Sequence, residues 1–308
     1  MKVVFMGTPD FAVPTLKAIL DSGYEVVGVI TATDKLLGRG KKRLSESPVK
    51  KFAVSRGLKV LQPPNLKRES FVEELRSLEA DIQVVVAFRM LPVVVWDMPP
   101  LGTYNLHGSL LPSYRGAAPI HWAVANGEAY TGLTTFKLKH EIDTGSIAYQ
   151  DVCMVPPGAT TGDMHDRMMY TGAALIVKTL KAIEEDNLLL KPQDASKASH
   201  APKVFHDDLQ LDFSKTANSL YHFIHGMSPF PGAWHYLEGK KVKVLRVDPV
   251  VPLQNDKLLP GEWTKLEDGR GALITADGAI PLKQVQPEGK GKMTGLSFTN
   301  GYLENESN

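Results

Sequence analysis

The chain has 308 residues, of which 43% are hydrophobic and 22% charged, with a formal net charge of +1 and a single cysteine. This composition is typical of a globular protein with about two domains, and it excludes a disulfide-stabilised secreted domain. We expect neither a signal peptide nor a membrane span, and therefore a cytoplasmic protein.

The first 107 residues alternate between apolar runs and amphipathic stretches. The apolar runs predict strands at 2–7, 24–31, 58–61, 81–88 and 103–107. Helices are predicted near 10–22, 48–57 and 67–79, and the pair Ser47-Pro48 is a favourable start for the second of them. This order predicts an α/β fold with a doubly wound, mostly parallel sheet.

The second half of the chain changes character after about residue 187. Before that point we predict a helix at 117–127, a hairpin arm at 131–138 and 146–155, and a long helix at 161–186. A polar, proline-containing stretch then predicts a linker at 190–206. Short strands at close spacing beyond it indicate a small β-barrel. We therefore expect one domain at 1–189 and a second at 207–308.

Positive charge is concentrated in one predicted loop. Residues 35–51 contain seven lysines and arginines against one glutamate, a charge of +6 in a chain whose net charge is +1. A charge run is usually only a solvated surface. Seven cations beside one acid, in a chain that is otherwise slightly acidic, nevertheless favour an RNA partner, because such cations can bind phosphates.

Polar side chains end the fifth predicted strand. Asn105 and His107 are two residues apart and therefore share one face of the strand, at the sheet edge where doubly wound folds form their sites. The best candidate for a carboxylate is Asp143, because the sharp turn Asp143-Thr144-Gly145 between the hairpin strands could direct it back toward this site. An amide, an imidazole and a carboxylate without a nucleophile suit an amine of the substrate attacking a carbonyl, because the amide and the imidazolium can stabilise the oxyanion. A structural role for His107 is the alternative.

Several segments carry a resemblance to a known family. They are FMGTPDFAVPTL (5–16), NLHGSLLPSYRGAAPI (105–120), IDTG (142–145) and PFPGAW (229–234). In this order they resemble the folate-dependent formyltransferases, and the whole chain is similar to the members that act on initiator tRNA. The resemblance implies a Rossmann-like formyltransferase catalytic domain at 1–189 and an OB-like, tRNA-binding C-terminal β-barrel at 207–308.

The same resemblance implies an activity and its participants. The formyl group of 10-formyltetrahydrofolate, a donor substrate, is transferred to the α-amino group of methionyl-initiator tRNA for translation initiation. The family's catalytic triad falls on Asn105, His107 and Asp143, without a metal, and we expect a monomer. Folate contacts are implied for Phe88, Arg89, Met90, Ser109, Leu110, Leu111 and Pro112. Contacts with tRNA are implied for Arg39, Lys41, Lys42 and Lys203.

Other functions compete with this interpretation. A formyltransferase for an amino-sugar nucleotide or for glycinamide ribonucleotide uses the same chemistry, but a small acceptor has less need of a +6 loop and a second domain. A dinucleotide-dependent dehydrogenase is disfavoured because FMGTPD has one glycine where a dinucleotide fingerprint has three. A non-catalytic RNA-binding module predicts that His107 is dispensable.

Overall fold

The computed structural model describes residues 1–37, 43–253 and 257–303. The chain forms two compact units. The first contains Met1–Gly116, Gly132–Cys153 and His165–His200, and the second contains Ala117–Thr131, Met154–Met164 and Ala201–Asn308. Among the described residues, no helix has both the length and the apolar character that crossing a membrane requires.

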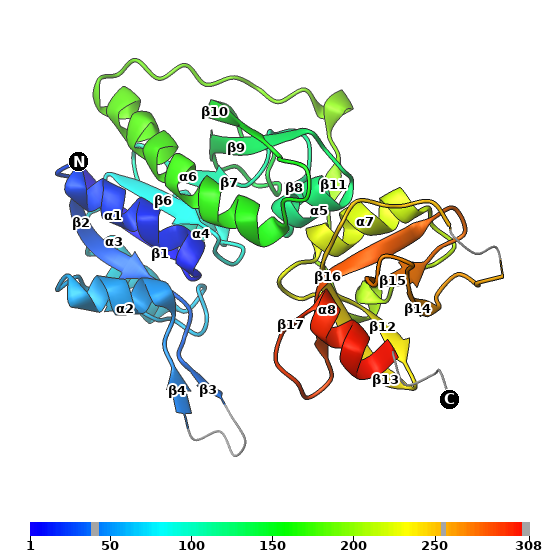
Figure 1. Ribbon diagram of the computed structural model, residues 1–308. Coiled ribbons are helices and arrows are strands. Elements are labelled where there is room, and N and C mark those ends of the chain that lie inside the picture. The colour runs from blue at the N-terminus through cyan, green and yellow to red at the C-terminus, as the bar shows by residue number, and fades with distance from the viewer. Residues whose placement is uncertain (38–42, 254–256, 304–308) are drawn as a thin grey trace. The chain divides into compact units, whose positions relative to one another are not determined.

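The first unit is built on a seven-stranded sheet with the order β10-β9-β7-β6-β1-β2-β5 (Figure 1). The strands are β1 (Lys2–Gly7), β2 (Glu25–Ile30), β5 (Val60–Leu61), β6 (Ile82–Val86), β7 (Thr103–His107), β9 (Tyr130–Lys137) and β10 (Ile147–Met154). Five neighbouring strands, from β7 to β5, are parallel, and β9 runs antiparallel to β7. The predicted doubly wound, mostly parallel sheet is therefore confirmed.

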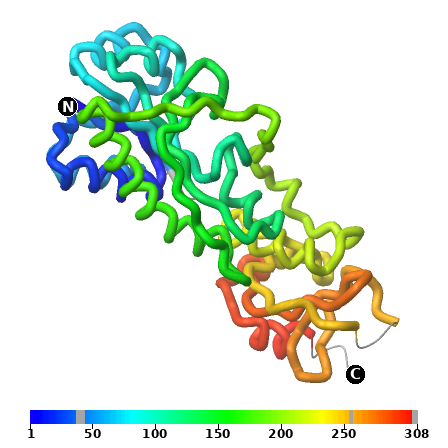
Figure 2. The backbone as a smooth tube through the Cα atoms, turned by 90° about the horizontal axis from the view of Figure 1, so that it is seen from above, coloured from blue at the N-terminus to red at the C-terminus, as the bar shows by residue number. Residues whose placement is uncertain are grey.

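Helices cover both faces of this sheet, so its central strands carry apolar residues on both sides. One face is covered by α1 (Val13–Asp21), α2 (Pro48–Ser55) and α6 (Thr161–Glu184), and the other by α3 (Glu69–Arg76) and α4 (Val93–Trp96). Figure 2 shows the cyan segment with α3 on the opposite side of the sheet from blue α1 and green α6. The short helix α4 was missed by the sequence analysis because four residues carry too little periodicity.

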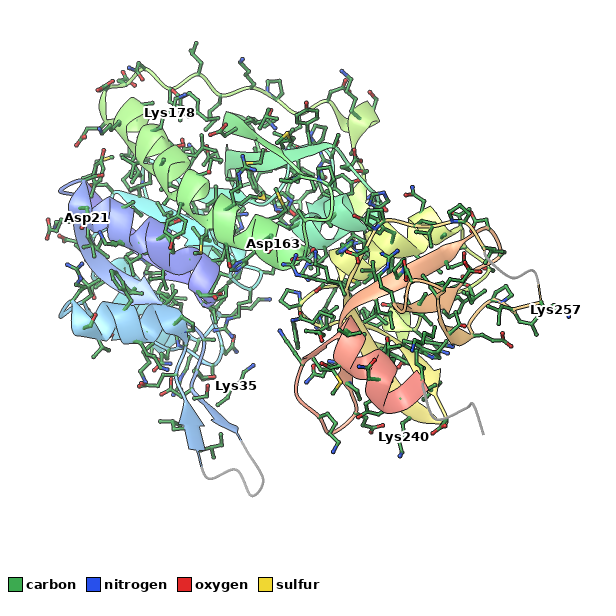
Figure 3. All side chains as sticks on the ribbon, viewed as in Figure 1. Asp21, Lys35, Asp163, Lys178, Lys240 and Lys257 are labelled. Atoms are coloured by element: carbon green, nitrogen blue, oxygen red, sulfur yellow. The ribbon has the colours of Figure 1, made fainter. Side chains whose placement is uncertain are left out.

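The helix starts follow the local sequence. At α2 the Ser47 hydroxyl accepts a hydrogen bond from the Lys50 N–H at 3.0 Å, and Pro48 occupies the first turn, as predicted. At α6 the Thr160 hydroxyl accepts from the N–H of Asp163 at 3.2 Å, and the Asp163 carboxylate accepts from the N–H of Thr160 at 2.8 Å. Asp163, labelled in Figure 3, also forms an ion pair with Arg246 at 2.7 Å.

The first part of the basic segment forms a hairpin, β3 (Lys35–Leu37) and β4 (Arg43–Ser45), rather than the loop we predicted, and its last residues belong to α2. Lys35 opposes Ser45 across the two strands, and its side chain is labelled in Figure 3. Residues 38–42, between the strands, lie outside the described residues.

The second unit contains a six-stranded antiparallel sheet in the order β12-β13-β16-β15-β14, with β17 paired to β16. Its strands are β12 (Ala233–Leu237), β13 (Lys240–Val247), β14 (Trp263–Lys265), β15 (Gly271–Ile274), β16 (Ala279–Pro287) and β17 (Met293–Thr294). Register shifts along β13 and β16 accompany the curl of this sheet into a half-barrel. The core lies between the sheet and α7 (Ala217–Gly226), with α5 (Pro119–Ala125) packed on α7.

Candidate active site

Strand β7 lies inside the sheet, between β9 and β6, and brings Asn105 and His107 toward the side of the sheet where the parallel strands have their carboxyl ends. Asn105 pairs in register with Val85 of β6 and Phe136 of β9, and His107 pairs with Thr134 of β9. His107 is buried and Asn105 is half-buried. Among the described residues, the Asn105 side chain has no hydrogen-bond partner, which leaves its amide able to bind an incoming polar group.

The imidazole of His107 is held from one side by the backbone. Its Nε2 lies 2.9 Å from the carbonyl oxygen of Tyr114, and because a carbonyl only accepts, Nε2 carries the proton and donates. Its Nδ1 lies 3.8 Å from Oδ2 of Asp143, close enough for an ion pair but too far for a hydrogen bond. The two side chains are only 7% and 12% exposed, so their mutual attraction in the protonated state is weakly screened.

The Asp143 carboxylate is fixed by a second backbone group. The N–H of Gly116 donates to its Oδ2 at 2.8 Å. Asp143 itself has a φ of 53°, a left-handed conformation that non-glycine residues rarely adopt. At Gly145, a Cβ would lie 1.8 Å from the carbonyl oxygen of Lys137, so only glycine fits there. The turn that carries the carboxylate is therefore closely packed.

Two side chains of the hairpin arm hold the loop after His107. Thr134 of β9 donates its hydroxyl to the Ser109 carbonyl at 2.7 Å and accepts from the Leu111 N–H at 3.0 Å. Gln150 of β10 donates to the Leu111 carbonyl at 2.9 Å. Neither Thr134 nor Gln150 could be predicted for this site, because nothing local to β9 or β10 indicates which loop their side chains meet.

The predicted folate stretch at 109–112 is tightly integrated into this network. Ser109 is fully buried and donates to the carbonyl of Ser113 at 2.6 Å. The side chain of Leu111 is buried, and those of Leu110 and Pro112 are half-buried. A ligand along this stretch therefore meets backbone atoms and the edges of Leu110 and Pro112 rather than the Ser109 hydroxyl.

The second predicted folate stretch follows β6. Phe88 packs partly into the apolar cluster beneath the sheet, and Met90 is 72% exposed. The guanidinium of Arg89 donates to the carbonyls of Pro63 and Pro64, the latter at 2.9 Å. Arg89 is therefore engaged in holding two loop segments together at the ends of β5 and β6.

The predicted tRNA contacts fall in two places. Arg39, Lys41 and Lys42 lie outside the described residues. Lys203 belongs to the second unit, where its exposed Nζ lies 5.4 Å from the ring centre of Phe205.

The base of the β3–β4 hairpin is anchored by charged and polar groups, one of which, Lys50, belongs to the basic run at 35–51. Lys50 forms ion pairs with Asp34 and with Glu46, the latter at 2.9 Å. The Gln62 amide donates to Asp34 at 2.8 Å and to the carbonyl of Ala32. The bonds from Lys50 and Gln62 hold the pKa of Asp34 below its ordinary value, so this network stays charged at neutral pH.

Within the described ranges there is no group of three or more histidine, cysteine or acidic side chains able to hold a metal ion. The polar groups around His107 are those of proton transfer and oxyanion stabilisation. An amide, an imidazole and a carboxylate at the strand ends of a doubly wound sheet suit the transfer of an acyl group to an amine.

Comparison with known proteins identifies that enzyme class. The family model described as formyl transferase matches residues 1–180, and that of the formyl transferase C-terminal domain matches 203–303. The chain belongs to the formyl transferase family and is a formyl-transferring enzyme. It is 45% identical to a methionyl-tRNA formyltransferase of Parabacteroides distasonis, over 99% of this chain and 96% of that protein. It is 43% identical to one of Flavobacterium johnsoniae, over 98% and 96% of the two chains.

Solved structures with much lower identity share the fold. An N-formyltransferase of Helicobacter canadensis in complex with folinic acid and dTDP-3-aminofucose has a TM-score of 0.68 at 19% identity, over 93% of this chain and 99% of that one. HypX of Aquifex aeolicus in complex with tetrahydrofolic acid has a TM-score of 0.65 at 17% identity. This chain is covered to 99% in that comparison and spans 48% of HypX.

Proposed function

We propose that this enzyme transfers the formyl group of 10-formyltetrahydrofolate to the α-amino group of methionyl-initiator tRNA, giving N-formylmethionyl-tRNA. The observation that carries the proposal is the full-length identity of 42–45% to relatives named methionyl-tRNA formyltransferase. The placement of His107 beside Asp143 supports it independently, because the two side chains come from segments far apart in the sequence and provide the required chemistry.

The reaction moves one acyl group and one proton. The neutral α-amine attacks the formyl carbon, and the carbonyl electrons become an oxyanion. The amine then loses a proton, the bond from carbon to N10 breaks, and N10 takes up a proton as tetrahydrofolate leaves. The protein has to stabilise the oxyanion and carry the proton.

In this proposal Asn105 and His107 stabilise the oxyanion. The Nε2–H of His107 is committed to the carbonyl of Tyr114, so the Nδ1–H of the imidazolium is the free donor. Nδ1 has no hydrogen-bond partner among the described residues, since Asp143 lies 3.8 Å away. The Asp143 carboxylate faces Nδ1 of this imidazole and accepts the proton that the amine releases. One donor of this kind contributes about 3–4 kcal/mol in the transition state.

We assign the remaining residues either to folate binding or to tRNA binding. Phe88, Arg89, Met90 and the 109–112 stretch form the folate side, where Arg89 acts through the Pro63-Pro64 loop that it holds. Arg39, Lys41 and Lys42 bind the tRNA acceptor end, with the hairpin base as their support, and Lys203 adds a further cation. The curled sheet of the second unit serves as an OB-like, tRNA-binding barrel. We further propose that the enzyme is a cytoplasmic monomer whose functional parts are 1–189, the linker 190–206, and 207–308.

A direct assay tests the proposal. The protein is incubated with 10-formyltetrahydrofolate and charged initiator tRNA, and the amino acid is released and its mass measured. A gain of one formyl group on methionine is expected. A dTDP-amino sugar or glycinamide ribonucleotide offered instead should remain unmodified; formylation of either, with the tRNA left untouched, would overturn the proposed acceptor. An NADH titration without binding disposes of the dehydrogenase alternative.

A further inference from the structure

One side chain in the segment predicted as a linker uses its whole hydrogen-bonding capacity at the candidate site. The Oε1 of Gln193 accepts from Nε and Nη2 of Arg115 at 3.1 and 2.7 Å. Its Nε2 donates to the carbonyls of Asp143 and Gly145, both at 2.8 Å. An amide has two acceptor sites and two N–H groups, so Gln193 is fully satisfied by these four bonds.

The partners of Gln193 belong to the two segments that hold the His107–Asp143 pair. Arg115 follows Tyr114, whose carbonyl binds His107 Nε2, and precedes Gly116, whose N–H binds the Asp143 carboxylate. The other two bonds of Gln193 go to the backbone of the turn that carries Asp143. One amide therefore joins the loop that orients the imidazole to the turn that orients the carboxylate.

Both joined segments contain backbone that needs support. Tyr114 and Asp143 have φ values of 59° and 53°, in the left-handed region that costs free energy for residues with a Cβ. Such conformations persist where surrounding contacts fix them. The four bonds of Gln193 are contacts of this kind, since they fix the carbonyl of Asp143 itself and the guanidinium next to Tyr114.

The segment that presents Gln193 is itself pinned on either side of it. Before Gln193, Lys191 and Ile147 exchange two backbone hydrogen bonds of 2.8 Å, which attach the segment to the edge of β10. After it, the Ser199 hydroxyl accepts from the Tyr114 N–H, and the Ser199 carbonyl accepts from the Arg115 N–H, both at 2.9 Å. Figure 1 shows the light-green segment after α6 passing the β10 edge of the sheet. Gln193 is thus held in place by its own neighbours.

We propose that Gln193 is a positioning residue for formyl transfer, which sets the separation and orientation of the His107 imidazole and the Asp143 carboxylate. It acts through Asp143 and does not touch the substrates. The inference rests on the proposed function, because it assigns to Gln193 a share of the catalytic effect of that pair. A side chain that merely stabilised the fold would leave the turnover of the folded enzyme unchanged.

The test is a double-mutant cycle between Gln193 and Asp143 in the full-length enzyme. Gln193→Met keeps the length of the side chain and removes all four bonds, and Gln193→Ala is the second variant. We expect kcat to fall about ten- to hundredfold, because without these bonds the imidazole and the carboxylate shift relative to each other by up to about 1 Å. The KM for each substrate should change less than about twofold. In an Asp143→Asn background the Gln193 substitution should lower kcat by less than about twofold further.

Asn187→Ala is the matched control. It also removes a side-chain amide from the segment after α6, and within the part of the chain that the structure describes this amide bonds only to Glu185, at 2.9 Å. Its kcat should match that of the unchanged enzyme. An equal loss of kcat from the Gln193 substitution in both backgrounds, or a raised KM with unchanged kcat, would overturn the inference alone. Full activity of Asp143→Asn would overturn the proposed catalytic site and the inference with it.

Discussion

Replacing Gly145 by alanine tests whether catalysis depends on the position of the Asp143 turn. The added Cβ would lie 1.8 Å from the carbonyl oxygen of Lys137, whereas real Cβ contacts are essentially never closer than 3.0 Å. Both atoms belong to or adjoin the backbone, so the turn itself has to move by about 1.2 Å. A displacement of about 1 Å in a catalytic group costs about a hundredfold in rate. We therefore expect kcat to fall by about two orders of magnitude.

The same change carries a stability cost that has to be separated from the catalytic one. Inserting a methyl group into a packed site lowers the free energy of unfolding by about 1–3 kcal/mol, so the variant remains folded in a protein of ordinary stability. Steady-state kinetics would give kcat and the KM of each substrate, and urea unfolding would give the stability. Gly291→Ala is the control, because a Cβ there meets nothing within 4 Å and the backbone is not left-handed. Normal kcat in a Gly145→Ala enzyme whose turn has moved would refute the positional argument.

Three further changes test other parts of the proposal. His107→Ala, which removes the oxyanion donor, should lower kcat by about two to four orders of magnitude in the formylation assay, and near-normal turnover would contradict its role. Replacing Arg39 and Lys41 together should raise the KM for tRNA and reduce the slope of log KM against log salt by about 0.9 per lost phosphate contact, while the folate KM stays unchanged. Burial, and to a smaller extent the positive charge of Arg246, lower the pKa of His225 from its ordinary 6.5 to about 4. The unfolded state therefore binds the proton more tightly. Stability should fall by up to about 3 kcal/mol as the pH drops from 6.5 to 4, and urea unfolding of His225→Leu should lack this component.

Much of the fold could be predicted from the sequence, because short stretches of sequence are enough to indicate its central strands and several of its helices. The buried runs at β1, β6 and β7 and the Ser47-Pro48 start of α2 follow from local periodicity and capping. The hairpin β3–β4 is not predicted from the sequence because strands of three residues, KLL and RLS, are too short to show a hydrophobic alternation.

In the candidate site, too, relations between residues close in the sequence could be predicted, and relations between distant residues could not. Spacing alone places Asn105 and His107 on one face of a strand, since that relation spans two residues. Asp143 could be suggested from its turn, but its 3.8 Å distance from His107 depends on how β9 pairs with β7, which only the folded sheet fixes.

The role proposed for Gln193 is the one that the sequence pattern indicates least. Its segment is polar and contains proline, which is the composition of a connection, and the composition is the same whether the segment is bound or free. What distinguishes it is the set of carbonyl and guanidinium partners brought to it by residues 115, 143 and 145, about 50 to 80 positions earlier. A reaction that needs an imidazole and a carboxylate at a set separation needs such long-range bonds, because neither β7 nor the 143–145 turn can fix the distance between the two alone. The residues that hold a catalytic pair are for this reason found in the bonds between segments, even where the pair itself is visible in the sequence.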